Sequence, residues 1–364
     1  MKKTKVIQLI EDLKVGGLER VISSIAYHLD STKYDLEIWC IARGGEVAGE
    51  LKAKGVKVRI LDILSYYNPL NILKLSRLFK SERVDILHCH GYFAATIGRI
   101  SGLLAGVSSL VVHIHTIFYQ LNKRNVLIDK FLNFFTKKII FISCAAKDSF
   151  LKAGYDLEAK AQVIYNGIED SGILEAETAT KDNIILIVAS LFPHKGHIYL
   201  LKAIAKVIKE FPDLVLWVVG DGPLKDGLQQ EADNLGIAKN VSFFGVRENV
   251  LEFIAQAAVC VLPSIREGLG MAAIEAMSQE KAVIASRVGG ILEVVLDGES
   301  GYLVPPQDVE ALAEKIMILL RDKTKREAMG KKGRELFEDK FKVEIMIAEL
   351  EKIYQKLAGG GHGK

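Results

Sequence analysis

The chain has 364 residues, of which 49% are hydrophobic and 26% charged, and its formal net charge at pH 7 is +3. This length predicts two domains, each large enough for a hydrophobic core of its own. No uninterrupted apolar run is long enough to span a bilayer, and the N-terminal apolar run breaks at Glu11 and Asp12, too soon for a signal peptide, which argues against the membrane-spanning and secreted classes.

Four cysteines, at positions 40, 89, 144 and 260, lie apart from one another in apolar runs. They form no Cys-x-x-Cys pair, so the sequence predicts neither a disulfide framework nor a zinc site of that kind. We expect them to be small core residues of a cytoplasmic protein, because that compartment keeps thiols reduced.

Strand patterns recur through the first half of the chain, separated by helical patterns such as 71–80 and 93–104. The expected strands are 5–10, 34–41, 57–60, 84–89, 110–115, 138–143 and 161–165. Strands that alternate with helices predict a parallel sheet covered by helices, with ligands at the carboxyl ends of the strands.

Two glycines, Gly16 and Gly17, follow the first strand and precede a helix expected to end near Leu29. They are candidates for a nucleotide-binding loop. The turn lacks the G-x-G-x-x-G spacing of dinucleotide-binding proteins, which argues against a nicotinamide dehydrogenase. The alternative is a tight turn that needs glycine for a positive φ.

Histidines stand in pairs at the ends of two predicted strands, as His88 and His90 and as His113 and His115. Alternate residues of a strand point the same way, so each pair could present two ligands to a metal. No cysteine or carboxylate accompanies them at a motif spacing, and we predict no metal site. The alternative to metal ligation is that these histidines have a structural role.

Residues 118–138 combine leucine, isoleucine and phenylalanine with five basic residues: Lys123, Arg124, Lys130, Lys137 and Lys138. A helix of this kind can lie in an anionic membrane interface, which would make the protein peripheral to the membrane and its acceptor lipid-linked. The alternative is a helix that packs its apolar face on the sheet and exposes its lysines.

A composition change divides the chain. Residues 170–182 lose hydrophobic periodicity and read as a linker. We therefore expect domains at 1–172 and 173–340, followed by an amphipathic helix within 341–358 and a flexible tail at 359–364.

The second half repeats the α/β pattern, with strands expected at 183–189, 214–220, 241–244 and 257–262. Lys195 lies in the turn after the first of these strands, just before a helix that starts near His197. The partial charges of a helix N-terminus and the full charge of a lysine together suit phosphate binding.

The stretch 262–276 carries the strongest motif. A glycine-rich turn holds Glu267, and the following helix holds Glu275. Backbone N–H groups near Gly268, Gly270 and Met271 would bind phosphate, whereas the carboxylates suit hydroxyl groups. The combination describes a sugar nucleotide, and two solvated surface carboxylates are the alternative.

Pro-Ser-x-x-Glu-Gly-x-Gly, with a second glutamate eight positions after the first, resembles the Glu-x7-Glu motif of the retaining glycosyltransferases of family 4. Segments 163–169, 282–293 and 297–308 are also similar to family segments, in the same order. The resemblance implies the α/β GT-B architecture, in which two Rossmann-like doubly wound domains face each other across a cleft. It also implies that the C-terminal helix crosses back to the first domain.

The resemblance further implies roles for individual residues. Lys195 and the amides near Gly268, Gly270 and Met271 would stabilise the leaving diphosphate, Glu275 would bind ribose hydroxyls and Glu267 sugar hydroxyls. His115 would contact the donor sugar from the opposite domain, the Val246 backbone would pair with the base, and Gly16 and Gly17 would lie across the cleft from the diphosphate.

One position departs from the family pattern. The family pattern is Gly-Arg-x-x-x-x-Lys-Gly. In this sequence Ala189 and Ser190 stand in place of its Gly-Arg pair. Ser190 can donate a hydrogen bond but supplies no charge, and losing a charge-assisted hydrogen bond typically costs ~1.5–3 kcal/mol. Either another cation compensates, or stabilisation of the leaving group is weaker.

By this resemblance the protein is a bacterial, retaining, metal-independent hexosyltransferase of polysaccharide or lipopolysaccharide biosynthesis. It would move a sugar from a nucleotide-diphosphate donor, expected to be a UDP-sugar, to a glycan or lipid-linked acceptor. It would need no cofactor besides this substrate and would bind no nucleic acid. Two alternatives remain: a sugar-nucleotide epimerase on the same fold, and a catalytically weak glycosyltransferase-like binding subunit.

Overall fold

The computed structural model describes residues 3–14, 16–65, 68–118, 122–157, 159–174 and 182–359. The chain divides into two compact units. Unit 1 contains the residues up to Glu169 together with those from Val343 onward, and unit 2 is Asp170–Lys342. Part of the expected linker and nearly all of the expected tail lie outside the described residues.

Unit 1 is built on a seven-stranded parallel sheet in the order β3-β2-β1-β4-β5-β6-β7. Its strands are β1 (Thr4–Asp12), β2 (Tyr34–Arg43), β3 (Val58–Ile60), β4 (Ile86–His90), β5 (Ser109–Ile114), β6 (Lys138–Phe141) and β7 (Ala161–Val163). Its helices are α1 (Gly17–His28), α2 (Glu46–Ala53), α3 (Pro69–Ser81), α4 (Tyr92–Ala105), α5 (Lys123–Phe135), α6 (Cys144–Lys152) and α14 (Val343–Gly359). The strands expected from the sequence are confirmed, with ends that shift by a few residues.

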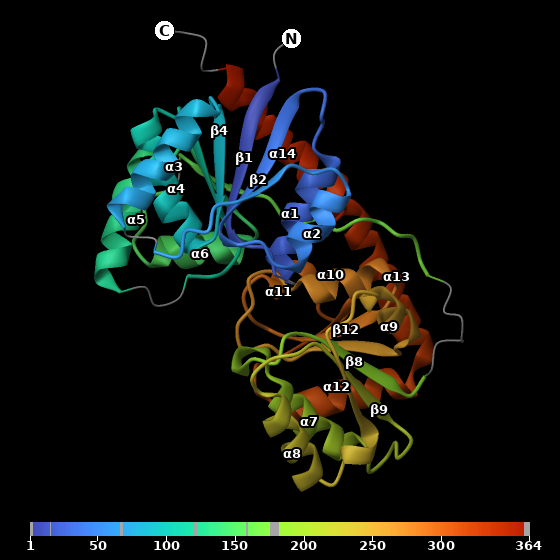
Figure 1. The fold of residues 1–364 in the computed structure, drawn as a ribbon. Helices are drawn as coiled ribbons and strands as arrows, with labels where there is room; N and C mark the ends of the chain where they lie inside the picture. Colours follow the sequence, from blue (N-terminus) through green and yellow to red (C-terminus); the bar gives the residue numbers. More distant parts are fainter. Residues whose placement is uncertain are drawn as a thin grey trace. The chain divides into compact units, whose positions relative to one another are not determined.

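Helices cover both faces of this sheet. On one face α4 lies close to the strands, because Gly98 has no side chain: a Cβ there would lie 2.5 Å from Leu9 Cδ2 and 2.7 Å from Cys89 Sγ. The other face is covered by the C-terminal helix α14, which appears in red beside β1 and β2 in Figure 1. Buried residues of α14, among them Met346 and Leu350, pack on β-strand side chains in one cluster.

Unit 2 has a six-stranded parallel sheet in the order β10-β9-β8-β11-β12-β13. Its strands are β8 (Ile184–Val188), β9 (Val215–Val219), β10 (Val241–Gly245), β11 (Val259–Leu262), β12 (Ala282–Ser286) and β13 (Gly301–Val304). Its helices are η1 (Pro193–Lys195), α7 (His197–Val207), α8 (Lys225–Asn234), η2 (Ala238–Asn240), α9 (Val250–Gln256), α10 (Met271–Ser278), α11 (Ile291–Val294), α12 (Val309–Arg321) and α13 (Lys323–Lys340).

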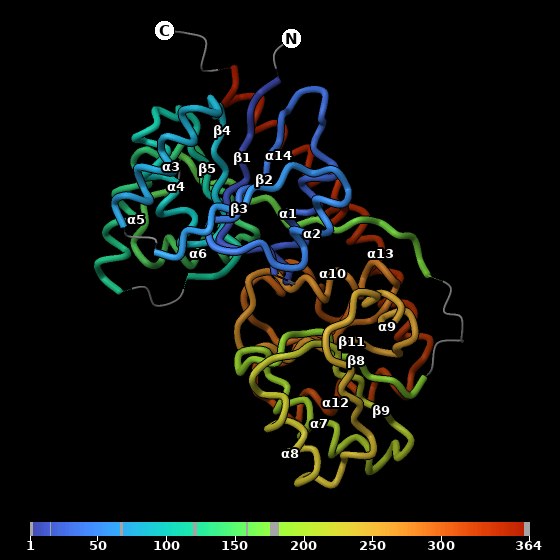
Figure 2. The backbone as a smooth tube through the Cα atoms, in the orientation of Figure 1, coloured from blue at the N-terminus to red at the C-terminus, as the bar shows by residue number. Residues whose placement is uncertain are grey.

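Both sheets reverse their strand order once, and the tube in Figure 2 follows the two paths. In unit 1 the reversal lies between β1 and β4, and in unit 2 it lies between β8 and β11. Ligands of doubly wound sheets bind outside the carboxyl ends of the strands at such a point. The turns after β8 and β11, which contain Lys195 and Glu267, therefore meet at this point of unit 2.

Three features differ from the sequence-based expectations or were missed. Helix α13 was not predicted, since its eighteen residues are mostly charged and bury only a narrow stripe that includes Met329, Gly333 and Phe337. Cys144, expected in the core, is exposed at the start of α6. The units also divide after Glu169 and Lys342, close to but not at the expected boundaries.

Within the described ranges, no helix combines the length and the apolar character needed to cross a membrane.

Candidate functional site

The turn after β8 is pressed against the turn after β11. Gly196 has a φ of +74°, and a Cβ at this position would lie 1.9 Å from the backbone oxygen of Pro263. The Ile265 N–H also donates to the His194 carbonyl at 2.8 Å. Only glycine permits this close approach of the two turns. Gly196 therefore holds the backbone of the preceding residue, Lys195, beside the turn after β11.

Lys195 and Glu267 meet at this junction. Lys195 Nζ lies 2.6 Å from Glu267 Oε2, and the Ser264 hydroxyl donates to the same carboxylate oxygen at 3.2 Å. Both side chains are mostly buried, with 20% and 15% of their surface exposed. The sequence predicted both residues for the site. It did not predict the role of Ser264, because the motif does not show where the Ser264 hydroxyl points.

Two more glycines support the turn that holds Glu267. A Cβ on Gly289 would lie 1.9 Å from the Glu267 carbonyl oxygen, and one on Gly290 would lie 2.2 Å from the Gly268 carbonyl oxygen. Gly270 then starts α10 with a φ of +95°, a conformation that favours glycine. Met271 is the first residue of α10, so Gly268, Gly270 and Met271 lie together at the N-terminal end of this helix.

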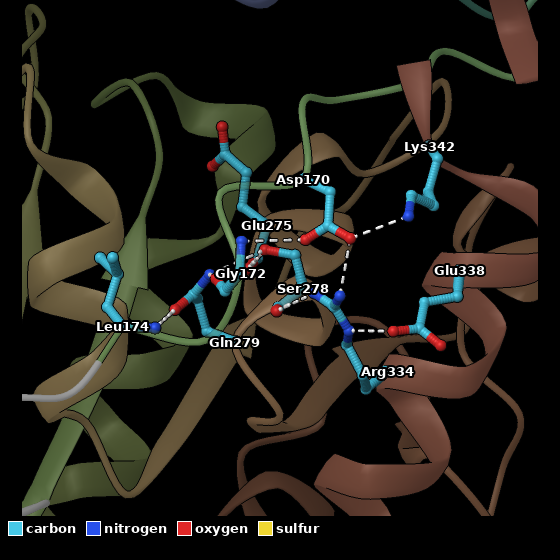
Figure 3. Close-up of polar contacts among 9 residues, drawn as sticks. All are labelled: Asp170, Gly172, Leu174, Glu275, Ser278, Gln279, Arg334, Glu338 and Lys342. Carbon is cyan, nitrogen blue, oxygen red and sulfur yellow. Dashed lines mark hydrogen bonds and ion pairs between the residues drawn. The ribbon is translucent and has the colours of Figure 1, made fainter. Parts of the chain in front are cut away.

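Glu275 is the fifth residue of α10 and is 6% exposed. Figure 3 shows its carboxylate pointing away from the polar contacts at the end of the same helix. There the Gln279 side chain accepts from the Leu174 N–H at 2.9 Å and donates to the Gly172 carbonyl at 2.8 Å. Helix α10 thus connects the turn of Glu267 with the segment that enters unit 2.

Asp170 ties together the two places where the chain passes between the units. Its carboxylate lies 2.7 Å from Arg334 Nη2 and 2.9 Å from Lys342 Nζ (Figure 3). The hydrogen bond from Arg334 holds the pKa of Asp170 well below its usual range. Arg334 also donates to the Ser278 carbonyl at 2.8 Å, which joins this cluster to the end of α10.

Other predicted donor-site residues lie at the carboxyl end of the same sheet. Ser190 follows β8 and is exposed, and Val246 follows β10 with 57% of its surface exposed. Burial lowers the pKa of His194, and the positive charges of Lys195 and Arg266 lower it further. Arg266 therefore lies in the same electrostatic neighbourhood as Lys195. It is a candidate for the second cation that Ser190 does not supply.

In unit 1, Gly16 and Gly17 begin α1 after β1. Gly16 has a φ of −177°, which is ordinary extended backbone, and neither glycine is among the described positive-φ residues. The alternative of a turn that requires positive φ is therefore wrong. A Cβ on Gly16 would lie 2.5 Å from the Glu19 carboxylate, so this glycine leaves room for the Glu19 side chain.

The four histidines gather on one face of the unit 1 sheet. His90 and His113 are register partners in β4 and β5, and the ring centroids of His113 and His115 lie 4.2 Å apart. Burial lowers the pKa of His88 and His115 to about 3 and the pKa values of the other two well below the usual range. All four rings are therefore neutral near pH 7.

Hydrogen bonds link three of these histidines through Gln8 and Tyr354. Gln8 Nε2 donates to the Tyr354 hydroxyl at 2.8 Å, and that hydroxyl lies 2.6 Å from His88 Nδ1. Gln8 Oε1 lies 2.6 Å from His90 Nε2, and His90 Nδ1 lies 3.0 Å from His115 Nε2.

The chemistry of these groups determines which atom donates in each hydrogen bond of this series, with the Gln8 amide oriented as in the structure. An amide oxygen only accepts, so His90 Nε2 carries the proton and His90 Nδ1 accepts from His115 Nε2. An amide nitrogen only donates, so the Tyr354 proton points to His88 Nδ1. His115 thus keeps Nδ1 as an unprotonated acceptor.

Ring nitrogens of His88, His90 and His113 lie within 4.8 Å of one another and could hold a metal ion. Both nitrogens of His90 already take part in hydrogen bonds. A divalent ion held only by neutral, fully buried rings would lack an anionic partner, which is unfavourable. We therefore describe the four histidines as a polar layer in which hydrogen bonds join His88, His90 and His115 to their neighbours, and the absence of a metal stays a prediction.

Comparisons with known families match both units. The family described as glycosyl transferases group 1 matches residues 173–336, and the family described as glycosyltransferase family 4 matches residues 15–171. An uncharacterised glycosyltransferase of Methanocaldococcus jannaschii is 30% identical, with 79% of this chain and 80% of that protein covered.

Two further proteins are similar over nearly the whole length. The UDP-Gal:α-D-GlcNAc-diphosphoundecaprenol α-1,3-galactosyltransferase of Escherichia coli is 25% identical over 93% of this chain and 94% of that protein. The crystal structure of Anabaena HepE in complex with UDP aligns with a TM-score of 0.85 and 23% identity, covering 97% of this chain and 100% of HepE.

Proposed function

Because the chain belongs to the group 1 glycosyltransferases, we propose that it moves a sugar from a UDP-sugar to a glycan or lipid-linked acceptor with retention at the anomeric carbon. Its two doubly wound units are those of the GT-B fold. The observation that carries the proposal is the junction of Lys195 with Glu267 at the strand-order reversal of unit 2. This junction supplies a cation and a carboxylate beside the N-terminus of α10.

The reaction follows from the charges that develop. As the sugar–diphosphate bond breaks, negative charge grows on the leaving phosphate, where Lys195 and the amides at the start of α10 stabilise it. Glu267 accepts hydrogen bonds from sugar hydroxyls and Glu275 from ribose hydroxyls, while the Val246 backbone pairs with the base. His115 contacts a hydroxyl of the donor sugar.

The acceptor oxygen forms its bond to the anomeric carbon on the face that the diphosphate leaves, and its proton passes to the leaving phosphate. No dedicated base and no metal is required by this scheme. A UDP-sugar is the proposed donor because the Escherichia coli relative is named as a UDP-galactose enzyme and the Anabaena structure contains UDP.

Helix α5 supports a lipid-linked acceptor. Leu127, Phe131 and Phe134 occupy one side of this helix and are 70%, 64% and 77% exposed. The alternative, that α5 packs its apolar face on the sheet, does not hold for these three residues, because Leu132 alone among the described residues of α5 is buried. Exposed basic residues accompany the stripe: Lys123, Arg124, Lys130 and Lys137. An apolar stripe with basic flanks suits the surface of an anionic membrane.

Vesicle binding tests this part of the proposal. We expect sedimentation with phosphatidylglycerol vesicles, little with phosphatidylcholine vesicles, and loss of binding in Phe131→Ser/Phe134→Ser. Leu104→Ser is the matched control, since Leu104 is 61% exposed on another helix of unit 1. Equal binding of both variants would remove α5 as the membrane contact.

Nucleotide binding tests the donor site. By calorimetry, UDP should bind more tightly than GDP, ADP or NAD, and Glu275→Ala should weaken UDP binding, while Glu314→Ala, an exposed carboxylate change on α12, should not. Release of UDP from UDP-sugars that depends on an added acceptor would support transfer. Interconversion of UDP-sugars without an acceptor would favour the epimerase, and no nucleotide binding by the folded protein would favour the binding subunit.

A further inference from the structure

Unit 1 contains a cavity of about 110 Å³ at the carboxyl end of β5. Residues of α4, α5 and α6 line it together with the segment after β5. They include Tyr92, His115, Phe118, Asp129, Asn133 and Phe150. A single water needs roughly 10–15 Å³ of such space, so this cavity has room for several waters or for one sugar ring.

The polar wall of the cavity is held from behind by a buried arginine. Arg99 is 0% exposed, and its Nη1 donates to Asn133 Oδ1 at 2.5 Å while Nη2 pairs with the Asp129 carboxylate. Its Nε donates to the Ala95 carbonyl at 2.9 Å. A buried arginine keeps its partners in place because breaking such a pair leaves an uncompensated charge. Asp129 and Asn133 are therefore fixed in position before any ligand arrives.

Part of the cavity lining is aromatic. The rings of Phe118 and Phe150 meet edge to face with centroids 5.2 Å apart. Rings that cover the apolar faces of a ligand, combined with a few fixed carboxylate and amide groups, are typical of sites for small polar molecules with apolar faces. A sugar ring has this character, because its C–H faces pack on aromatic rings and its hydroxyls bond to carboxylates and amides.

His115 connects the cavity with the expected position of the donor sugar. It lines the cavity and is also the residue expected to contact the donor sugar. Helix α5 forms one wall with Asp129 and Asn133, while its other side carries the exposed stripe of Leu127, Phe131 and Phe134. A sugar attached to a membrane lipid could reach the cavity while the lipid remains beside α5.

We propose that this cavity is the acceptor subsite and holds one sugar ring of a lipid-linked acceptor. The inference rests on the proposed transferase function. The acceptor's sugar ring packs against Phe118 and Phe150. The hydroxyls of this sugar bond to Asp129 and to the amide of Asn133. The hydroxyl that attacks the donor points to the side of His115.

Saturation-transfer NMR with the methyl glycosides of glucose, galactose and N-acetylglucosamine tests the subsite directly, with UDP present as an internal reference. We expect transfer to at least one glycoside in the wild type and its loss in Ala95→Leu, which fills the cavity from α4, where Ala95 is 3% exposed. UDP should keep its signal in both proteins.

Phe118→Ala is a second variant in case Ala95→Leu does not fold, because it removes the aromatic wall and leaves Arg99 and its partners unchanged. It should reduce the glycoside signal by at least severalfold. Glycoside signals that are absent from the wild type, or unchanged in a folded variant, would overturn the subsite. Loss of the UDP signal from the wild type would instead contradict the proposed function.

Discussion

Lys195 and Glu267 are 72 positions apart in the sequence, yet their charged groups lie 2.6 Å apart. The pairing follows from strand order, since β8 and β11 are neighbours and each is followed by one of the two turns. The carboxylate pairs with the lysine charge, and both side chains are mostly buried. A diphosphate that binds there must share the ammonium group with Glu267 or replace it.

Replacing Lys195 with methionine should reduce kcat by about 10²–10³-fold, because a preorganised charge that stabilises the leaving group is lost. UDP affinity should fall by at least about tenfold. Steady-state kinetics and calorimetry measure the two effects, and Lys206→Met, on the exposed side of α7, is the control. A variant with wild-type kcat would show that Lys195 only pairs with Glu267.

Arg266→Gln should weaken UDP binding several-fold if Arg266 supplies the charge that Ser190 lacks. Arg287→Gln is the comparison: Arg287 is also an arginine of unit 2, and its guanidinium lies 2.5 Å from the Asp297 carboxylate. The double variant Ser190→Arg/Arg266→Gln should recover part of the lost affinity in calorimetry. Unchanged UDP affinity in Arg266→Gln would leave the donor site with one cation.

Gly289→Ala should abolish UDP binding or folding of unit 2, since the new Cβ would meet the Glu267 carbonyl. Gly298→Ala is a matched control: Gly298 has a φ of +81°, but a Cβ there has no atom within 4 Å. The control should cost only about 1–2 kcal/mol of backbone strain and keep UDP affinity. Thermal melting and calorimetry of both proteins separate strain from collision, and equal behaviour would count against the packing described here.

The buried histidines make stability depend on pH in a defined direction. Burial lowers the pKa of His88 and His115 to about 3, whereas these groups titrate near 6.5 when unfolded. Between these values the unfolded chain binds more protons, so the free energy of unfolding falls as pH decreases from about 6.5 toward 3. Each such histidine contributes up to about 1.4 kcal/mol per pH unit.

Urea unfolding at several pH values measures this slope. His113→Phe should flatten it and cost little stability at pH 7, because among the described residues neither ring nitrogen of His113 has a hydrogen-bond partner. A slope that is identical in the variant would mean that His113 is not protonated on unfolding in this range.

The chain of hydrogen bonds from Tyr354 predicts one tautomer for three histidines. His88, His90 and His115 should all carry their proton on Nε2, which ¹⁵N NMR of the imidazole nitrogens reports. Tyr354→Phe removes the acceptor of the Gln8 amide, so His115 should then show a mixture of tautomers, with a lower kcat and unchanged UDP affinity. Nδ1-protonated rings in the wild type would reverse the assigned direction.

Much of the fold was predictable because parallel strands buried on both faces read as short apolar runs, as 34–41 and 110–115 do. The candidate site residues Lys195, Glu267 and Glu275 were predictable because they belong to local motifs that follow strands. Whether these residues carry the assigned roles stays a prediction.

The missed features depend on partners far along the chain. The role of Gln8 is set by Tyr354, 346 positions away, and Arg99 organises a cavity through Asp129 and Asn133. Gly289 matters because of the Glu267 carbonyl, and a glycine in sequence does not reveal which backbone approaches it. Helix α13 was missed because its charged composition hides a narrow buried stripe.

The return of α14 to unit 1 has a consequence for biosynthesis. The strands of unit 1 leave the ribosome first. One face of their sheet stays uncovered until Met346, Leu350 and the rest of α14 have been translated, which happens after all of unit 2. Unit 2, a continuous segment, can fold in the meantime. The nascent chain therefore carries an uncovered apolar surface through about half of its synthesis, a period in which chaperones can bind it and premature termination leaves it exposed.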